Sequence, residues 1–400
     1  MKKVMYRINI LLLFIVITSY FMSCEKEVTP SLFDPDKPSK PTPVITDIIP
    51  HGSAYAVIEE VTIKGSNFSS TPDENLVFFD GSKAKVTTAS ATQLTIITPN
   101  VTGDSLEVKI AVLGAELYSE PVFYKLKPSV STIGTFLETE TEGYAVAVDL
   151  DENVYVSLTG KLIKKITPED VTTTLASVSF LTPNGGMKMG PGYTLYAAFS
   201  AGRVRKIATI SPDGNEGTYV TLPGAPQDFD FDADGNIWIS VDKDIYLIKP
   251  DASPTQIKTF SLPLKTVRVF DGYLYISGMD EATGEAKIWR SQIQGETLGT
   301  EEEVLDLTAA WLNNSTINSF TFSEDGEMYI ATDNLDAIFT YNPVDGSHKT
   351  LYPGLIGPNI IAFCWGEGQD IYALQQLSGS FNVLKIVIRK NGAPYYGRKP

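Results

Sequence analysis

The feature that most constrains the fold is a sixfold repeat between residues 145 and 375. Each copy has an apolar strand, a turn of Gly, Asp or Asn, and a second apolar strand that carries an aromatic residue. These aromatics follow one another at intervals of 41, 42, 37, 54 and 43 residues: Tyr155, Tyr196, Trp238, Tyr275, Tyr329 and Tyr372. Short strands at this period are typical of propeller blades, because one four-stranded blade cannot bury its faces without stacked neighbours. The repeat therefore predicts an all-β fold with a six-bladed β-propeller over residues 127–400.

The last blade of this propeller is one strand short in the sequence. After the apolar run at 383–388 only a polar tail with Gly and Pro remains, whereas residues 131–138 are claimed by no blade. We expect the strand at 131–138 to close the last blade, because this pairing leaves no exposed edge at the join. The repeat pattern resembles that of NHL-type six-bladed propellers.

A second module is predicted at residues 43–126. Short runs with alternating apolar and polar residues, at 61–65, 76–79, 93–97, 108–112 and 122–124, are typical of a small antiparallel sandwich. Three motifs, PVITDIIPHG at 43–52, VTIKGSNF at 61–68 and FFDGSKA at 78–84, resemble the IPT/TIG immunoglobulin-like module. The resemblance implies a spacer or interaction domain that precedes the propeller.

The N-terminus resembles a bacterial lipoprotein signal. Residues 1–23 have a basic start and an apolar run too short for a typical membrane span, and Cys24 follows directly. The resemblance implies cleavage before Cys24 and lipidation of this residue. Residues 24–42 are rich in Pro and charge and predict a flexible stalk. The acidic residues after Cys24 resemble a tag that directs lipoproteins to the outer face, so we expect a lipid-anchored protein on the outer membrane that faces the cell exterior.

The amino-acid composition argues against several kinds of ligand and catalytic site. With 48 acidic and 32 basic residues, the net charge of −16 argues against nucleic acid as a partner, since binding to nucleic acid requires basic patches. The two histidines, His51 and His348, each lack a second histidine or a cysteine at the spacing of a zinc site. With so few histidines, a Ser-His-Asp catalytic triad is also disfavoured. Cys364 lies in an apolar strand and is predicted to be a small buried hydrophobe. We expect no cofactor and no metal, and we interpret the acidic run at 230–235 as a blade turn rather than a calcium loop, because position 12 of such a loop would be Val241.

Propeller geometry predicts where a ligand binds. Loops at the starts of the inner strands open around the channel on one face, where amide and acidic side chains recur. The loop at 309–315 adds Trp311 beside two amides, and an aromatic ring with neighbouring amides suits a sugar. The alternative is that Trp311 fills the seam between blades 4 and 5. The predicted ligand-binding residues are Trp311, Asn313, Asn314, Asn318, Asn184, Gln227, Asn359, Asp280 and Asp333.

The combination of modules resembles lipoproteins of bacterial glycan-utilisation systems. This resemblance implies a protein that binds an oligo- or polysaccharide through its propeller and supports uptake, in partnership with an outer-membrane transporter complex. Two alternatives stay open. One is a propeller enzyme, either a metal-dependent lactonase or a polysaccharide lyase, although the scarcity of histidine argues against it. The other is a protein-interaction or adhesion scaffold, which a broad apolar surface patch would indicate.

Overall fold

The computed structural model describes residues 38–179, 186–251, 253–280, 282–308, 310–312 and 315–400. Within these ranges the chain consists of β-strands, turns and short 3-10 helices. None of the helices described there has the length and apolar character needed to cross a membrane. The fold class expected from the sequence, a small immunoglobulin-like sandwich followed by a six-bladed propeller, is confirmed.

The sandwich contains two sheets, and one of them includes a parallel pair of strands. One sheet has the order β1 (Val44–Ile49), β3 (Glu60–Ser66), β7 (Gln93–Ile97) and β6 (Lys85–Ala89). The other has the order β2 (Ser53–Tyr55), β9 (Val122–Lys127), β8 (Gly103–Val112), β4 (Asn75–Phe79) and β5 (Ser82–Lys83). In β8 buried and more accessible residues alternate, so that Val108 and Ile110 are fully buried. This alternation is the period-two pattern on which the sequence prediction depended.

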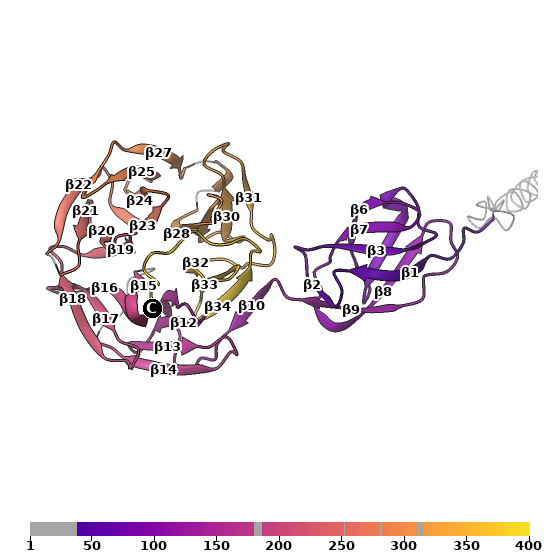
Figure 1. The fold of residues 1–400 in the computed structure, drawn as a ribbon, viewed down its shortest axis with the longest axis horizontal. Helices are drawn as coiled ribbons and strands as arrows, with labels where there is room; N and C mark the ends of the chain where they lie inside the picture. The colour runs from indigo at the N-terminus through magenta and orange to yellow at the C-terminus, as the bar shows by residue number, and fades with distance from the viewer. Residues whose placement is uncertain (1–37, 180–185, 252, 281, 309, 313–314) are drawn as a thin grey trace, which may run out of the picture. The chain divides into compact units, whose positions relative to one another are not determined.

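The propeller has six sheets that Figure 1 shows around a central axis. Each sheet begins with an inner strand next to this axis and proceeds outward. Blade 1 is formed by β11 (Gly143–Val148), β12 (Val154–Leu158), β13 (Leu162–Ile166) and β14 (Thr172–Ser177). Blade 2 is formed by β15 (Met187–Met189), β16 (Leu195–Ala201), β17 (Val204–Ile210) and β18 (Glu216–Thr221). Blade 3 is formed by β19 (Pro226–Phe231), β20 (Ile237–Val241), β21 (Asp244–Ile248) and β22 (Thr255–Thr259).

Blades 4 to 6 follow the same plan with two variations. Blade 4 adds a short hairpin strand, β26, and blade 6 takes its outer strand from the N-terminal side. Blade 4 is formed by β23 (Leu264–Phe270), β24 (Tyr273–Met279), β25 (Ala286–Gln294), β26 (Thr297–Leu298) and β27 (Glu302–Asp306). Blade 5 is formed by β28 (Ile317–Phe322), β29 (Met328–Thr332), β30 (Ile338–Tyr341) and β31 (His348–Thr350). Blade 6 is formed by β32 (Ile360–Trp365), β33 (Asp370–Leu377), β34 (Ser380–Val387) and β10 (Val130–Ile133).

The outer strand of blade 6 precedes all the other propeller strands in the sequence. β10 pairs with β34 in antiparallel register from Val130 opposite Ile386 to Ile133 opposite Val383. The sequence placed this strand at 131–138, so its position differs by a few residues at both ends. Apolar side chains of blade 1, including Val146 and Val156, pack with Tyr372 and Val383 of blade 6 in one core cluster. The ring is therefore closed both by hydrogen bonds and by side-chain packing.

The repeated aromatics have a structural role that explains their spacing. In blade 3, Trp238 is fully buried and its Nε1 donates to Asp232 Oδ2 at 2.9 Å. In blade 1, the hydroxyl of Tyr155 donates to Asp149 Oδ2 at 2.8 Å. Both aspartates also accept backbone N–H groups of the turn that joins the first two strands. A buried aromatic with a polar tip needs such an acceptor, and in these two blades the acidic turn before the aromatic supplies it. The acidic run at 230–235 is thus a blade turn. In blade 5 Tyr329 donates to Glu327 of its own turn, whereas in blade 6 Tyr372 donates to Glu152 of blade 1.

Candidate functional site

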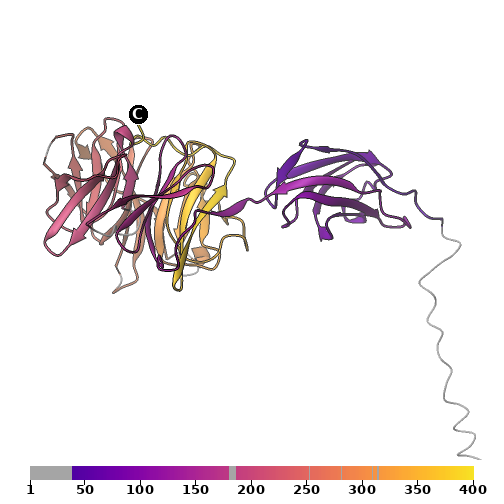
Figure 2. The ribbon, with the colours of Figure 1, turned by 90° about the horizontal axis from the view of Figure 1, so that it is seen from below.

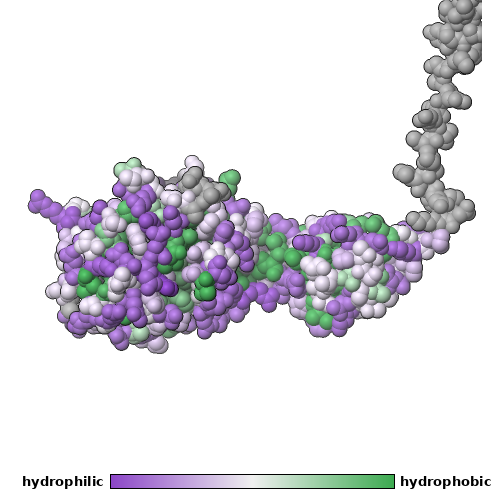
Figure 3. All heavy atoms as spheres, turned by 90° about the horizontal axis from the view of Figure 1, so that it is seen from above, coloured by the Kyte–Doolittle hydropathy of each residue, from purple (hydrophilic) through white to green (hydrophobic). Residues whose placement is uncertain are grey.

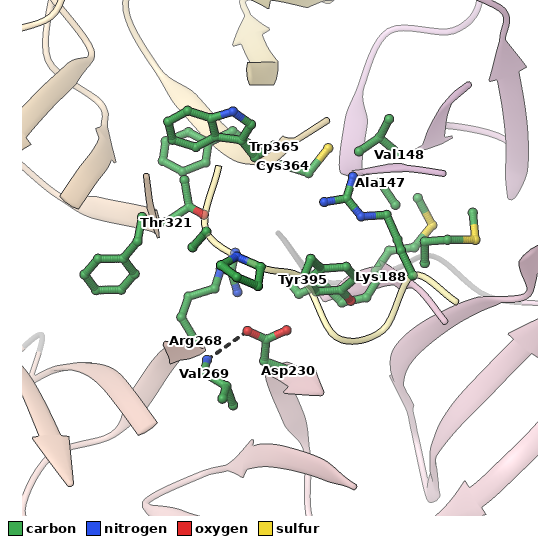
Figure 4. A pocket seen from close by; sticks show the side chains of 17 residues that line it. Ala147, Val148, Lys188, Asp230, Arg268, Val269, Thr321, Cys364, Trp365 and Tyr395 are labelled. Carbon is green, nitrogen blue, oxygen red and sulfur yellow. Dashed lines mark hydrogen bonds between the residues drawn. The ribbon is translucent and has the colours of Figure 1, made fainter. Parts of the chain in front are cut away.

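Each blade contributes one equivalent residue to a ring around the channel. The residue that pairs with the repeated aromatic lies on the inner strand, and all six of these residues line a single cavity on the propeller axis, shown in Figure 4. The ring residues are Ala147, Lys188, Asp230, Arg268, Thr321 and Cys364. Three of the six, Lys188, Asp230 and Arg268, are acidic or basic side chains from adjacent blades, and we call the six residues the channel ring.

Buried ion pairs connect three blades at this level. The carboxylate of Asp228, which is 2 % exposed, lies 3.0 Å from Lys188 Nζ and 2.7 Å from Arg268 Nη1. Arg268 Nη2 also donates to Ser319 Oγ of blade 5 at 3.2 Å. A buried charge is tolerated when it is paired and hydrogen-bonded, and here one carboxylate compensates two cations. The network ties together the inner strands of blades 2, 3, 4 and 5.

Asp230 is the second buried carboxylate of the channel. Its Oδ2 accepts the backbone N–H of Val269 at 2.9 Å, the hydrogen bond drawn in Figure 4. Burial raises the pKa of Asp230 to about 6, although Arg268 and Lys188 act in the opposite direction. Burial, with a further contribution from Arg268, lowers the pKa of Lys188. Burial also raises the pKa of the Cys364 thiol to about 12, so this side chain stays protonated near neutral pH.

The sequence patterns described above place Asp230 only in an acidic run at a blade turn, and they predict no role for Asp228, Lys188 or Arg268. The spacing of the repeat nevertheless contains a signal for the channel-ring residues. In five of the six blades the channel-ring residue stands eight positions before the repeated aromatic, and in blade 4 it stands seven before. Counting back from each aromatic would have identified the whole ring.

The C-terminal tail covers one end of the channel. The tail is bound to turns that follow inner strands: Glu324 N–H donates to Asn391 O, and Gly192 N–H donates to Lys399 O, both at 2.9 Å. Figure 2 shows the C-terminus on one face of the propeller, and Figure 4 places Tyr395 among the side chains of the channel ring. The tail residues that line the cavity are Ala393, Pro394, Tyr395 and Arg398. This end of the channel, where the inner strands finish, is thus closed by the chain itself.

Two predicted ligand residues lie together at the opposite end, where the inner strands begin. Asn318 Nδ2 donates to the carbonyl of Ile360 at 2.9 Å, and the neighbouring Asn359 donates through Nδ2 to Gln376 O at 3.1 Å. Both side chains are half-buried. Within the described part of the chain neither Oδ1 atom has a hydrogen-bond partner, so both remain acceptors. Gln227, at the start of the blade 3 inner strand, is exposed.

Trp311 lies in the 3-10 helix η3 (Ala310–Leu312) and packs against blade 5. Its ring is stacked on His348 with centroids 4.3 Å apart and on Tyr341 at 5.9 Å, and it contacts Phe339 edge-on. It belongs to an apolar cluster shared by blades 4 and 5. This placement corresponds to the seam alternative, since His348 lies on the outer strand of blade 5 and not at the channel. The side chain is half-buried, and its role in sugar binding stays a prediction.

The other predicted site residues are dispersed. Asp280 Oδ1 accepts the N–H of Ala282 in its own hairpin, and Asp333 Oδ1 accepts the N–H of Thr316. Both carboxylates therefore stabilise loops. The predictions for Asn184, Asn313, Asn314 and Cys24 concern positions outside the described residues. Among the residues that are described, no group of three or more His, Cys, Asp or Glu side chains is arranged to hold a metal ion.

Comparison with known proteins gives the family of the first module and the fold of the second. Residues 43–126 match the IPT/TIG domain. No curated protein sequence matches the chain. Among solved structures, an auxiliary nutrient binding protein from Bacteroides thetaiotaomicron is 14% identical over 90% of this chain and 99% of its own, with a TM-score of 0.51.

Two further structures have a similar fold. A protein of unknown function from Bacteroides thetaiotaomicron has a TM-score of 0.51 and 15% identity, over 88% of this chain and 99% of its own. A gluconolactonase from Xanthomonas campestris has a TM-score of 0.50 and 12% identity, over 71% of this chain and 91% of its own. At such identities the likeness establishes the fold alone. The chain therefore has a first module that matches the IPT/TIG domain and a six-bladed β-propeller, and its fold is similar to that of the nutrient binding protein and, over a smaller share of the chain, to that of the gluconolactonase.

Proposed function

We propose that this protein is a lipid-anchored protein of the outer surface that binds a glycan at the end of its propeller channel where the inner strands begin, and that it supports uptake of that glycan. The observation that carries the proposal is the pair of asparagine acceptors at this end. Asn318 and Asn359 each fix their amide by donating to a backbone carbonyl, and each leaves an Oδ1 atom as acceptor. Acceptors held in this way can receive sugar hydroxyls, and the exposed amide of Gln227 can both donate and accept.

The charge of the channel favours a neutral ligand at this end. Lys188 and Arg268 are both ion-paired with Asp228, so these two cations are engaged within the protein and not with a ligand at the asparagine pair. A polyhydroxy ligand exchanges hydrogen bonds with amides and needs no counter-charge. The similarity in fold to an auxiliary nutrient binding protein supports a role in nutrient capture. The lipid anchor at Cys24 and the partnership with an outer-membrane transporter complex rest on the sequence.

The two alternatives receive less support. A metal-dependent lactonase would need a cation site at the channel, where Lys188 and Arg268 place positive charge. An adhesion scaffold would need a broad apolar patch. On the side of the propeller seen in Figure 3 hydrophilic residues predominate and hydrophobic ones are scattered. The exposed large hydrophobic side chains of the propeller come from separate segments: Leu137, Val171, Val204, Leu335, Val344 and Leu377.

The test is a glycan array followed by calorimetry. We expect the protein without residues 1–24 to retain a small set of related glycans on the array. Gln227→Ala and Asn318→Ala should each weaken the best of them by about fivefold, as for one lost hydrogen bond of about 1 kcal/mol. Gln256→Ala is the matched control, because Gln256 is an exposed amide on the outer strand of the same blade as Gln227. No binding on the array, or equal affinity in all three variants, would contradict the proposal.

A further inference from the structure

The cavity beneath the channel ring is not explained by glycan binding at the opposite end. It has a volume of about 60 Å³ and is bounded by the channel ring and by the C-terminal tail. A cavity needs about 10 to 15 Å³ of such space to hold one water molecule, so this one accepts a few waters or one small ion and no sugar ring. Its walls include Trp365 of blade 6 together with Tyr395 and Arg398 of the tail.

Three residues of this wall carry buried donor atoms that have no acceptor. Trp365 Nε1, Tyr395 Oη, and Arg398 Nε and Nη1 are each shielded from solvent and form no hydrogen bond with the described residues. The Arg398 side chain is only 5% exposed; its Nε lies 3.4 Å from Glu367 Oε1, a carboxylate that is 48% exposed. A buried donor without an acceptor costs free energy, and native proteins rarely leave several in one place. An occupant that accepts hydrogen bonds would remove this cost.

The charges around the cavity are predominantly positive. Three cationic side chains line it, Lys188, Arg268 and Arg398, against a single carboxylate, Asp230. Asp228, next to them, is engaged by both Lys188 and Arg268. Arg398 thus has no buried carboxylate to compensate it among the described residues, since its ion-pair partner, Glu367, is half-exposed. The unmatched donors and the excess positive charge occur at the same place.

We propose that this cavity is a binding site for one small anion, a halide or a small oxyanion. Arg398 supplies the charge, and Trp365 and Tyr395 supply neutral donors on other sides. The small volume of the cavity favours a small anion over a bulky one, and the tail covers one side of it. This site goes beyond the proposed glycan-binding function, because it lies at the closed end of the channel and shares no residue with the asparagine pair at the opposite end. Ordered water could accept the same hydrogen bonds but would leave the charge uncompensated.

The experiment measures thermal unfolding of the intact protein while anions are titrated at constant ionic strength. The small anions are bromide and selenate, which represent the halide and the oxyanion, and the bulky anion is morpholinoethanesulfonate. We expect the melting temperature to rise saturably with bromide or with selenate, because a ligand of the native state stabilises it. The bulky anion should give no saturable rise. Equal rises with all three anions would indicate a general salt effect and would overturn the proposal.

Substitutions in the tail test whether the response to small anions comes from this cavity. Arg398→Gln should weaken the saturable response by about tenfold or more, since it removes a charge-assisted hydrogen bond. Lys399→Gln is the matched control: it removes one positive charge from the same tail, but Lys399 is exposed and does not line the cavity, so the response should persist. If Arg398→Gln fails to fold, Tyr395→Phe keeps the ring and removes one donor, and unchanged affinity in that variant would overturn the proposal.

A crystal structure grown with bromide and selenate gives the second readout. We expect an anomalous peak within hydrogen-bonding distance of Arg398 and of Trp365 or Tyr395. A peak from bromide alone assigns the site to halides, and a peak from selenate assigns it to oxyanions. Density for water only, with no anomalous signal in the cavity, would overturn the proposal. Neither result depends on glycan binding, which the array tests with separate residues.

Discussion

Asp230 shows how burial and charge compete at a single side chain. The carboxylate is 3 % exposed, and the charged or titratable groups that act on it are Lys188 of β15, Arg268 of β23, Asp228 of its own strand and Tyr395 of the tail. Burial outweighs the attraction of the cations, because the pKa rises to about 6 from the usual 3.8. The folded protein therefore binds a proton at Asp230 in a pH range where the unfolded chain does not.

This pKa predicts a dependence of stability on pH. The contribution of Asp230 to the free energy of unfolding is complete below about pH 4 and is lost as the pH rises through 6, a change on the order of 2 kcal/mol. Asp230→Asn stays neutral and can still accept the Val269 N–H, so it should remove this part of the dependence. Denaturant unfolding between pH 4 and pH 7 measures it. The exposed Asp213→Asn variant is the control and should keep the slope; an unchanged slope in Asp230→Asn would refute the assignment.

The stacking of Trp311 leads to a second prediction at this scale. Because the ring packs on His348 and Tyr341 but is half-exposed, Trp311→Ala should lower the free energy of unfolding by about 1 to 3 kcal/mol, less than for a fully buried tryptophan. Thermal and denaturant unfolding measure this loss. The sugar-platform role predicted from the sequence requires, in addition, a loss of glycan affinity in the same variant, which calorimetry would detect. An unchanged melting temperature would show that the packing contributes little.

At the scale of the strands, much of the propeller could be predicted because each blade repeats the same local chemistry. In blades 1 and 3 the aromatic and its acceptor lie within one hairpin, so their spacing is visible in the sequence. The channel ring follows from the same register. The asparagine pair could also be predicted, because Asn318 and Asn359 both lie near the starts of neighbouring inner strands, although they do not occupy equivalent positions of the repeat. Local pairing therefore determines most of what the sequence predicts about the fold.

What could not be predicted depends on contacts between distant segments. The tail at 391–399 has no strand pattern, and its hydrogen bonds connect it to turns in blades 2 and 5. The acceptor-free donors of Arg398 and Tyr395 result from where the tail lies, which its own sequence does not encode. Trp311 is similar, since its stacking partner His348 belongs to the next blade. Local sequence patterns carry no information on such contacts.

The closing strand supplies a prediction about one element. A propeller chain that starts at Gly134 keeps blades 1 to 5 but lacks β10, so one edge of β34 loses its partner. We expect a lower melting temperature and a greater tendency to aggregate than for a chain that starts at Lys127, because an unpaired edge strand is a template for association. Differential scanning calorimetry and light scattering compare the two chains. Equal melting temperatures would mean that β10 does not contribute to closure.

For the whole molecule, the charge distribution limits the ligand. The chain has a net charge of −16, while Lys188 and Arg268 are buried in the channel. An acidic surface repels polyanions during approach, whereas a neutral glycan is unaffected. A small anion in salt solution experiences this repulsion only over about 8 Å, roughly the screening length at physiological ionic strength. On the array we expect neutral glycans to be retained and sulfated ones to be absent, and retention of mainly sulfated glycans would contradict this expectation.

The last prediction concerns attachment of the whole molecule to the membrane. Residues 1–23 and Cys24 resemble a lipoprotein signal, and acyl chains on Cys24 would contribute about 0.8 kcal/mol for each CH₂ group buried in the bilayer. Cys24→Ser should therefore abolish incorporation of labelled fatty acid and release the protein from the outer-membrane fraction. Cys364→Ser is the matched control, because the chain's other cysteine lies in β32 of the propeller and should not affect attachment. Fractionation and protease accessibility on intact cells measure both anchoring and exposure to the exterior. If the Cys24→Ser protein stays with the outer membrane in unchanged amount, acylation at this residue is not what holds the protein there.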